Sequence, residues 1–264
     1  MTRDRPELPA DIALLLDRLR NALLARGGLV GVYLYGSLCT GDFSAAHSDI
    51  DVLVLLEREP DKGAISELRE LHTTLASSDD PAGRLHCLYA SALDAADPAL
   101  ERTYWYGDQM TQWRVKLLTQ AELVAAGVPL YGPWPPPGLG PVAVPDLQAA
   151  AREEITGYWW RVARRRRLWL KDIWVDFGLV TLPRAEALLT AGDLITKSEA
   201  IRRLPGFGVP AALADQIRRR RDGQDVPLGT LQRIRRARVA RRLMRRGIRR
   251  LTSPPAREGQ PRPR

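Results

Sequence analysis

Hydrophobic positions in the first half of the chain switch between a helical period and short strand-like runs. Residues 9–25 place five apolar side chains on one helical face, and Gly27 and Gly28 indicate where this helix ends. The runs 29–35 and 50–56 are short, rich in Val and Leu and bounded by Gly, Ser or Asp, which is typical of paired strands. The five apolar helix residues are Ile12, Leu15, Leu16, Leu19 and Leu23.

The sequence downstream continues to alternate between helices and strands. A helical period covers 65–75, while 84–89 and 113–118 predict a third and a fourth strand. Thr119 and Glu122 match a capping box, so we expect a short helix to follow the fourth strand. Strands and helices mixed in this way predict an α/β domain with a mixed sheet.

A proline-rich segment separates this half from the rest of the chain. Residues 132–146 carry six prolines, which predicts a semi-rigid spacer without regular structure. We therefore expect one domain over 1–138, a second over 139–252 and a disordered tail over 253–264.

Helical periods dominate the second domain and predict an all-α bundle. We expect one long helix over 147–177, another ending at Gly192, a third beginning at Thr196 and a last one over 228–251. Ten arginines fill the polar faces of the last helix. Its apolar stripe consists of Ile234, Ala237, Ala240, Met244, Ile248 and Leu251.

Composition places the chain among globular proteins. Of its 264 residues, 45% are hydrophobic and 27% charged, and no stretch approaches the roughly 18 uninterrupted apolar residues of a membrane span. Charges at Asp17, Arg18 and Arg20 interrupt the first apolar run, which indicates an amphipathic helix and not a secretory leader. The chain has only two cysteines, Cys39 and Cys87, which are too few for a disulfide framework and lack the spacing of a metal site. A reducing compartment, the cytoplasm, is therefore expected.

The net charge of +9 comes almost entirely from arginine. Only four of the 40 basic residues are lysines, a skew that indicates a coding bias more than selection for phosphate contacts. The arginine-dense last helix could nevertheless follow a phosphate backbone, so weak nucleic-acid binding stays open beside the commoner outcome of a solvated helix face.

The main candidate for chemistry is a Gly-Ser pair followed, after eleven residues, by Asp-Ile-Asp. Gly36 ends a predicted strand and lets backbone amides approach a phosphate, and Ser37 offers a hydroxyl to the same group. Asp49 and Asp51 stand at i and i+2 at the start of the next strand, so their carboxylates share a face. Two such carboxylates beside a phosphate turn suit Mg²⁺, which favours carboxylate and phosphate oxygens together.

Either part of this pattern alone is usually an ordinary turn or a solvent-facing strand. The combination at this spacing resembles the signature of the polymerase-β-type minimal nucleotidyltransferase fold. The stretch 179–205, with LYGP at 130–133, also looks like the aminoglycoside adenylyltransferases that modify streptomycin and spectinomycin. That resemblance implies that Arg184 and Lys197 bind the ATP phosphates. A salt-bridged Arg184 and a solvated Lys197 are the alternative.

The resemblance departs from the family at three places. The position of the family's glutamate base is occupied by His86, whose neutral imidazole could take a proton but adds no negative charge for a metal. A half-buried strand residue without a role is an equal interpretation. Four carboxylates could replace the glutamate, and the sequence selects none of them. They are Asp94, Asp97, Glu101 and Asp108.

The other two departures concern the ligands. Arg219 falls where the family stacks a tyrosine on the adenine, and an arginine plane can also stack on a base. The family's contacts to the cationic antibiotic do not align with this chain's aromatic and acidic residues, which are Trp169, Asp172, Trp174 and Asp176. Other tryptophans, including Trp105, Trp159 and Trp160, could line an acceptor pocket, although core packing is the commoner fate.

The resulting hypothesis is an enzyme that uses Mg²⁺ and transfers AMP from ATP to a hydroxyl of a small acceptor. By resemblance, the leading acceptor class is an aminoglycoside-type antibiotic, and no membrane association is expected. Two alternatives stay open. One is adenylylation of a protein or an RNA, and the other is a degenerate module that binds a nucleotide without turnover, as the histidine at position 86 suggests.

Overall fold

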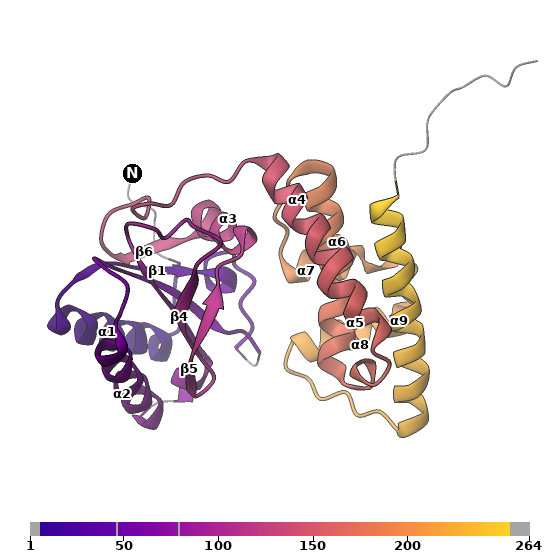
Figure 1. Cartoon of the computed structure of the whole chain (residues 1–264). Helices are drawn as coiled ribbons and strands as arrows, with labels where there is room; N and C mark the ends of the chain where they lie inside the picture. Colours follow the sequence, from indigo (N-terminus) through magenta and orange to yellow (C-terminus); the bar gives the residue numbers. More distant parts are fainter. Residues whose placement is uncertain (1–5, 46, 79, 254–264) are drawn as a thin grey trace, which may run out of the picture. The chain divides into compact units, whose positions relative to one another are not determined.

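The computed structural model describes residues 6–45, 47–78 and 80–253, which form two compact units (Figure 1). The first unit runs to Leu147 and includes Arg221–Gly223. The second comprises Gln148–Arg220 and continues from Gln224. Most of the tail expected over 253–264 lies outside the described residues.

The first unit is built around a mixed six-stranded sheet. Its strand order is β5-β4-β3-β2-β1-β6, in which β2 and β3 pair in parallel and the other neighbours are antiparallel. The expectation of a mixed α/β sheet is confirmed. The strands are β1 (Leu29–Tyr35), β2 (Ile50–Leu56), β3 (Leu85–Ser91), β4 (Glu101–Tyr106), β5 (Gln109–Arg114) and β6 (Val128–Tyr131).

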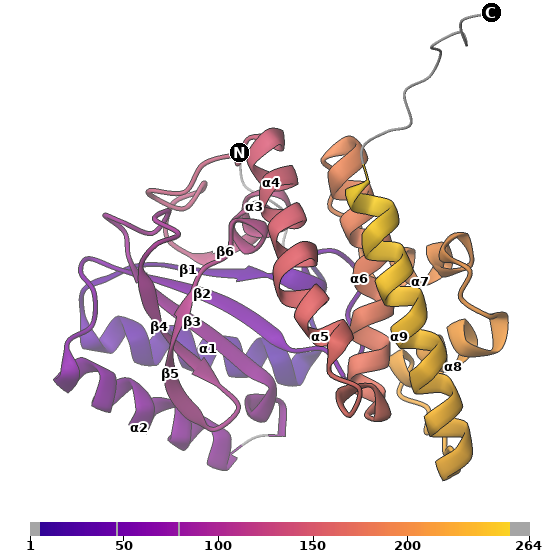
Figure 2. The same cartoon turned by 45° about the vertical axis from the view of Figure 1, so that its right-hand side comes forward.

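Helices cover the two faces of this sheet unequally. Helices α1 (Ala10–Arg26) and α2 (Lys62–Ser78) lie against one face, where they bury the larger of the unit's two apolar clusters (Figure 2). The five apolar residues predicted for the first helix are all buried there. Helix α3 (Leu117–Ala126) packs on the opposite face through Leu123. Leu123 lies there in a second buried cluster with Tyr35 and other residues of β1–β3.

Three predictions in the first half were wrong in their boundaries. The fourth strand expected over 113–118 is instead the second arm of a hairpin formed by β4 and β5, and it ends at Arg114. The helix expected from the capping box begins earlier, at Leu117, so Thr119 lies inside α3 and caps nothing. Regular structure also reaches into the proline-rich segment, because Pro145 stands in the first turn of a helix, where a missing N–H is tolerated.

The second unit is helical throughout its regular structure. The single helix expected over 147–177 was wrong, because the chain leaves the helical conformation at Arg165 and again at Lys171. Between these breaks Trp169 turns inward, is fully buried, and donates from Nε1 to the carbonyl of Val162 at 3.1 Å. Burial of this large ring offsets the lost helical hydrogen bonds.

The remaining helices follow the predicted ends closely. Gly192 caps α6 in the left-handed conformation, and Thr196 caps α7, as expected. The segments are α4 (Val144–Glu154), η3 (Ile155–Trp159, a π turn), α5 (Trp160–Arg164), η4 (Leu168–Leu170), α6 (Asp172–Ala191), α7 (Lys197–Arg203), η5 (Leu204–Phe207), α8 (Ala211–Arg221) and α9 (Thr230–Thr252). Among the described residues, no helix is long and apolar enough to cross a membrane.

The interior of the second unit depends on close packing at Gly178 of α6. A Cβ on this residue would lie 2.7 Å from Cη2 of Trp169 and 3.4 Å from Cζ3 of Trp159. We expect Gly178→Ala to destabilise the fold by about 1–3 kcal/mol, because both rings are packed and cannot retreat. Urea unfolding followed by tryptophan fluorescence measures this loss.

The matched control for this prediction is Gly157→Ala in the neighbouring π turn. A Cβ there meets nothing nearer than Arg161 Nη1 at 3.7 Å, an ordinary contact. The control should unfold at the wild-type urea concentration or above it, since alanine favours helix. Equal destabilisation by both variants would show that the packing at Gly178 is not tight.

Candidate active site

The turn after β1 brings the backbone against a carboxylate. Gly36 has a φ of +74°, a conformation that favours glycine, and a Cβ at this position would overlap Oδ2 of Asp51. The turn is closed by backbone hydrogen bonds from Cys39 N to Gly36 O and from Asp42 N to Ser37 O, each 3.1 Å long. Only glycine therefore lets Asp51 approach the turn this closely.

Strand register places the predicted acidic residues opposite His86. Asp51 pairs with Tyr35 of β1 on one side and with His86 of β3 on the other, so all three side chains emerge on the same face of the sheet. Asp49 immediately precedes β2 and reaches the same point. The distance from His86 Nε2 to Asp49 Oδ1 is 3.5 Å, and from His86 Nδ1 to Asp51 Oδ1 it is 3.7 Å. The two carboxylates therefore converge on one imidazole.

The exposure of these three side chains is graded across the cluster. Asp49 is 48% exposed and Asp51 26%, whereas His86 is only 12% exposed. The carboxylates thus form the accessible edge of the cluster, and the imidazole lies behind them. An incoming ligand would meet carboxylate oxygens before it meets the ring.

An aromatic group continues the same face towards the edge of the sheet. Tyr106 lies 4.7 Å from the His86 ring between centroids, and Tyr104 lies 5.9 Å from both His86 and Trp113. Tyr106 and Trp113 are about half exposed. The sequence analysis missed this group, although the i, i+2 spacing of the tyrosines in ERTYWY was a signal for it.

The carboxylates also act on the nearest tyrosines. Burial, and then the negative charges of Asp51 and Asp49, raise the pKa of Tyr104 well above its ordinary value. Burial and the charge of Asp51 have the same effect on the pKa of Tyr35. Both phenols are therefore protonated at neutral pH and can donate hydrogen bonds.

Other carboxylates considered as replacements for a catalytic glutamate have contacts of their own. Asp94 pairs with the buried Arg102 at 3.1 Å, and Glu101 lies 3.6 Å from Arg114 across the hairpin. Asp97 Oδ1 accepts a hydrogen bond from the backbone of Ala99. Asp108 lies exposed in the β4–β5 turn.

The donor set of the cluster fits a hard divalent cation. Asp49 and Asp51 present accessible carboxylate oxygens beside a glycine turn, and Mg²⁺ typically binds one or two carboxylates together with substrate phosphates. Among the described residues, no group of three or more His, Cys, Asp or Glu side chains is arranged to hold a metal ion. A bound cation here would need ligands from the nucleotide as well.

The predicted phosphate-binding residues of the second unit stand on adjoining helices. Arg184 of α6 donates from Nε to the carbonyl of Ile195 at 3.2 Å, two residues before Lys197. Thr196 and Glu199 form the predicted capping box, which places Lys197 in the first turn of α7. Hydrogen bonds with Thr196 lower the pKa of Glu199. Nζ of Lys197 lies 5.3 Å from the ring centroid of Phe177.

The residues considered for adenine and antibiotic contacts are engaged within their own unit. Asp172 pairs with the buried Arg236, and Asp176 binds Arg220 through two hydrogen bonds of 2.6 and 2.7 Å. Arg219 donates to Gln224 Oε1 at 2.8 Å. Three tryptophans considered for an acceptor pocket or contact are core residues, namely Trp105, Trp159 and Trp169.

Comparisons with known proteins find a matching family model and a similar fold. Residues 16–129 match a family model described as a nucleotidyltransferase domain. The fold is similar to the crystal structure of spectinomycin adenyltransferase AAD(9) from Enterococcus faecialis with ATP and spectinomycin. That match has a TM-score of 0.67 at 13% identity and covers 88% of this chain and 99% of the other.

Two further comparisons give no similar fold and no related sequence. A toxin-antitoxin structure with AMP-PNP matches at 20% identity over 58% of this chain and 93% of that one, but its TM-score is only 0.28. No curated protein matches the chain.

Residues 16–129, which match the nucleotidyltransferase-domain model, include the glycine turn, the paired carboxylates and most of the mixed sheet. Together with its helical second unit, the chain shares its fold with the spectinomycin adenyltransferase structure. The resemblance inferred from the sequence is thereby confirmed at the level of the fold.

Proposed function

We propose that this protein transfers AMP from ATP to a hydroxyl of a small acceptor, and that it does so with Mg²⁺. The observation that carries the proposal is the convergence of the solvent-accessible carboxylates of Asp49 and Asp51 beside the Gly36 turn. A nucleotidyltransferase domain over residues 16–129 and the fold shared with an ATP-bound adenyltransferase support it.

Each residue of the site has a role in this proposal. Gly36 and Ser37 bind the terminal phosphates of ATP through the backbone and hydroxyl of the turn. Asp49 and Asp51 hold Mg²⁺, which when bound would neutralise phosphate charge and align the reacting groups. Arg184 and Lys197, both cationic, bind the ATP phosphates, as the family resemblance implies.

The proposed reaction is an in-line displacement at the α-phosphorus. The acceptor oxygen forms a bond to this phosphorus, the bond to the bridging oxygen of pyrophosphate breaks, and pyrophosphate leaves with the electron pair. His86 accepts the proton of the acceptor hydroxyl, since its imidazole is the base that lies nearest to both carboxylates.

We propose an aminoglycoside-type antibiotic of the streptomycin or spectinomycin class as the acceptor. The similar adenyltransferase structure contains spectinomycin, and one feature of this chain suits such a ligand. The half-exposed rings of Tyr106 and Trp113, on the same face as the carboxylates, offer it apolar and cation–π contacts.

The decisive experiment is incubation of the protein with α-labelled ATP, Mg²⁺ and a panel of aminoglycosides. We expect labelled AMP to appear on at least one drug and to be lost in Asp49→Asn. The matched control is Asp17→Asn, the same change at an exposed carboxylate of α1, which lies against the opposite face of the sheet, and it should keep wild-type activity. Label transfer by Asp49→Asn at the wild-type rate would refute the assignment of the site.

A nucleotide-binding module without turnover is the second candidate, and the position of His86 favours it. Its two ring nitrogens lie 3.5 and 3.7 Å from carboxylate oxygens of Asp49 and Asp51, so the ring would compete with a cation for these oxygens. Calorimetric binding of ATP without label transfer to any acceptor would support this candidate. Label transfer to any drug would exclude it.

A further inference from the structure

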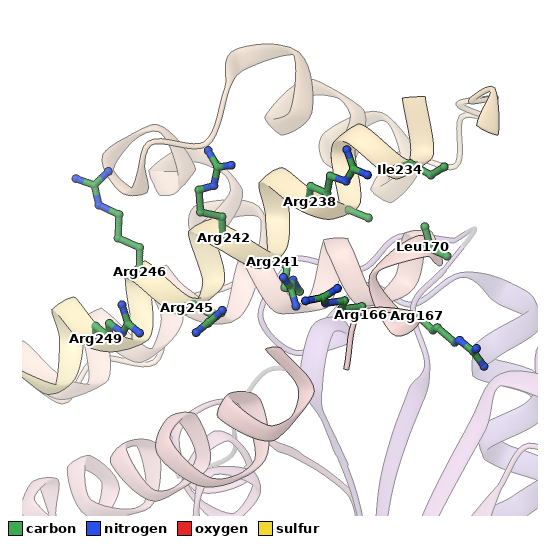
Figure 3. Close-up of a pocket in the computed structure, with 11 residues that line it drawn as sticks. Arg166, Arg167, Leu170, Ile234, Arg238, Arg241, Arg242, Arg245, Arg246 and Arg249 are labelled. Carbon is green, nitrogen blue, oxygen red and sulfur yellow. The ribbon is translucent and has the colours of Figure 1, made fainter. Parts of the chain in front are cut away.

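A groove lined by arginines lies within the second unit, between the η4 turn and α9 (Figure 3). Its volume is about 920 Å³, and no acidic residue lines it. Leu170, Ile234 and Ala237 supply its apolar surface. The arginines that line it are Arg166, Arg167, Arg238, Arg241, Arg242, Arg245, Arg246 and Arg249.

Within the described residues, the groove arginines have no carboxylate partners, unlike two other arginines of α9. Arg236 and Arg250, which stand on the same helix but outside the groove, pair with Asp172 and Glu186. In the part of the chain that the structure describes, none of the eight groove arginines forms an ion pair. Charge repulsion among them is therefore not offset within the protein, and a bound polyanion would relieve it.

The positive charge is extended along α9 and does not form a single point. Arg238, Arg242 and Arg246 recur at every fourth residue, and a second row at Arg241, Arg245 and Arg249 accompanies them. From 238 to 249 the helix advances about 16 Å, with about one arginine of each row per turn of roughly 5.4 Å. Such a stripe matches a chain of anions spaced at a regular interval.

Part of this stripe is held in position. The guanidinium groups of Arg245 and Arg249 each lie 5.8 Å from the ring centroid of Trp160, which orients them. Across the groove, Arg166 points towards Arg241 (Figure 3). The planar guanidinium binds phosphate oxygens through two parallel hydrogen bonds, so arginine suits a phosphate chain better than lysine would.

We propose that this groove binds the phosphate backbone of single-stranded nucleic acid, as a site separate from the carboxylate cluster. A single nucleotide is too short to engage both ends of the stripe. A duplex is a rigid convex rod, which cannot follow the arginines on both sides of a groove as a flexible strand can. A flexible strand can place successive phosphates along α9 and lay sugars or bases on the apolar residues of the groove.

Fluorescence anisotropy with labelled single-stranded RNA and DNA oligonucleotides of mixed sequence tests the proposal. We expect both to bind, with log K falling linearly with log salt concentration. Replacing three exposed groove residues by glutamine, R238Q, R242Q and R246Q together, should weaken binding at least about tenfold. It should also make the salt slope less negative by about two, since each phosphate contact on a single strand contributes roughly 0.7.

The matched control removes the same charge from exposed arginines of the same unit outside the groove, with R152Q, R203Q and R235Q together. It should bind within about twofold of wild type. Equal loss in both triple variants would show that binding follows net charge alone, and the proposal would fail. Circular dichroism of each variant confirms that the helices remain.

Three competitors separate the ligand chemistries. A duplex of equal length should bind more weakly, and polyglutamate of equal charge should displace the strand poorly. Saturating ATP should leave the strand bound, and D49N should bind it like wild type, because the groove does not use the carboxylate site. Tighter binding of the duplex, displacement by polyglutamate at matched charge, or displacement by ATP would each overturn the proposal.

Discussion

Replacement of Asp51 by asparagine is expected to lower the rate of AMP transfer at least about a thousandfold, with little change in stability. Asp51 lies against the Gly36 turn and is more enclosed than Asp49, so its carboxylate is the one closest to the expected phosphates. Asparagine keeps the shape but removes the negative charge that holds a divalent cation. Loss of several kcal/mol of transition-state stabilisation corresponds to at least this factor.

Steady-state kinetics with α-labelled ATP and the best acceptor of the panel measures the effect. The loss should appear mainly in kcat, and D49N/D51N should be little slower than D51N alone, because residues that act as a unit are not additive. The control D17N should keep its rate. A D51N enzyme within tenfold of wild type would mean that the chemistry takes place elsewhere.

The position of this site could be predicted from the sequence because strand geometry is periodic. An i, i+2 spacing at the start of a strand places Asp49 and Asp51 on one face whatever the rest of the fold does. The first helix could be predicted equally well, since its apolar stripe alone identifies the buried residues. Thr196 and Glu199 likewise act locally, and their capping box forms as predicted. Local rules succeed where the partners are near in sequence.

The strands at the edge of the sheet were harder to predict from the sequence, because long-range contacts determine where they form. Strand β4 contains Arg102, a charged residue that is 2% exposed and paired with Asp94, so the strand does not show a clean polar and apolar alternation. The break at Arg165 depends in the same way on burial of Trp169 in a core assembled from distant helices. Neither the burial of Arg102 nor the helix break at Arg165 has a local signal in the sequence.

The structure shows the position of His86, whereas its role remains a prediction. The parallel register that sets it opposite Asp51 involves residues 35 positions apart, and it explains why the histidine lies within 4 Å of both carboxylates. Whether the imidazole takes a proton or hinders a cation depends on the bound nucleotide. Transfer assays on His86→Gln distinguish the two, since removal of the base should lower the rate if the imidazole takes the proton and should leave or raise the rate if the imidazole hinders a cation.

A second histidine, His72 of α2, is expected to make the protein sensitive to acid. Its side chain is 1% exposed, stacks on Trp105 at 4.7 Å between centroids, and contacts the hydroxyl of Tyr89 at 2.7 Å through Nε2. Burial, and to a lesser extent the charge of Arg26, lower its pKa from 6.5 to about 3. The folded protein therefore holds this ring neutral throughout the mildly acidic range.

Protonation of His72 favours the unfolded chain, because the pKa in the unfolded state is higher than in the folded state. Its contribution to stability is complete above about pH 6.5 and is lost as the pH falls towards 3, at up to about 1.4 kcal/mol per pH unit. Urea unfolding at pH 7.5, 6.5, 5.5 and 4.5 measures the slope. Other carboxylates titrate in the same range, so the comparison with a variant isolates this histidine.

His72→Gln keeps a hydrogen-bonding side chain but cannot acquire the charge. It should be less stable than wild type at pH 7.5, because the stacking on Trp105 is lost, and the difference should shrink by about 1.4 kcal/mol for each unit below pH 6.5. His47→Gln, at an exposed loop histidine, should keep the wild-type slope. Parallel stability curves for wild type and His72→Gln would show that the buried ring accepts a proton without unfolding. The core between α2 and the sheet would then tolerate a charge that its apolar lining should exclude.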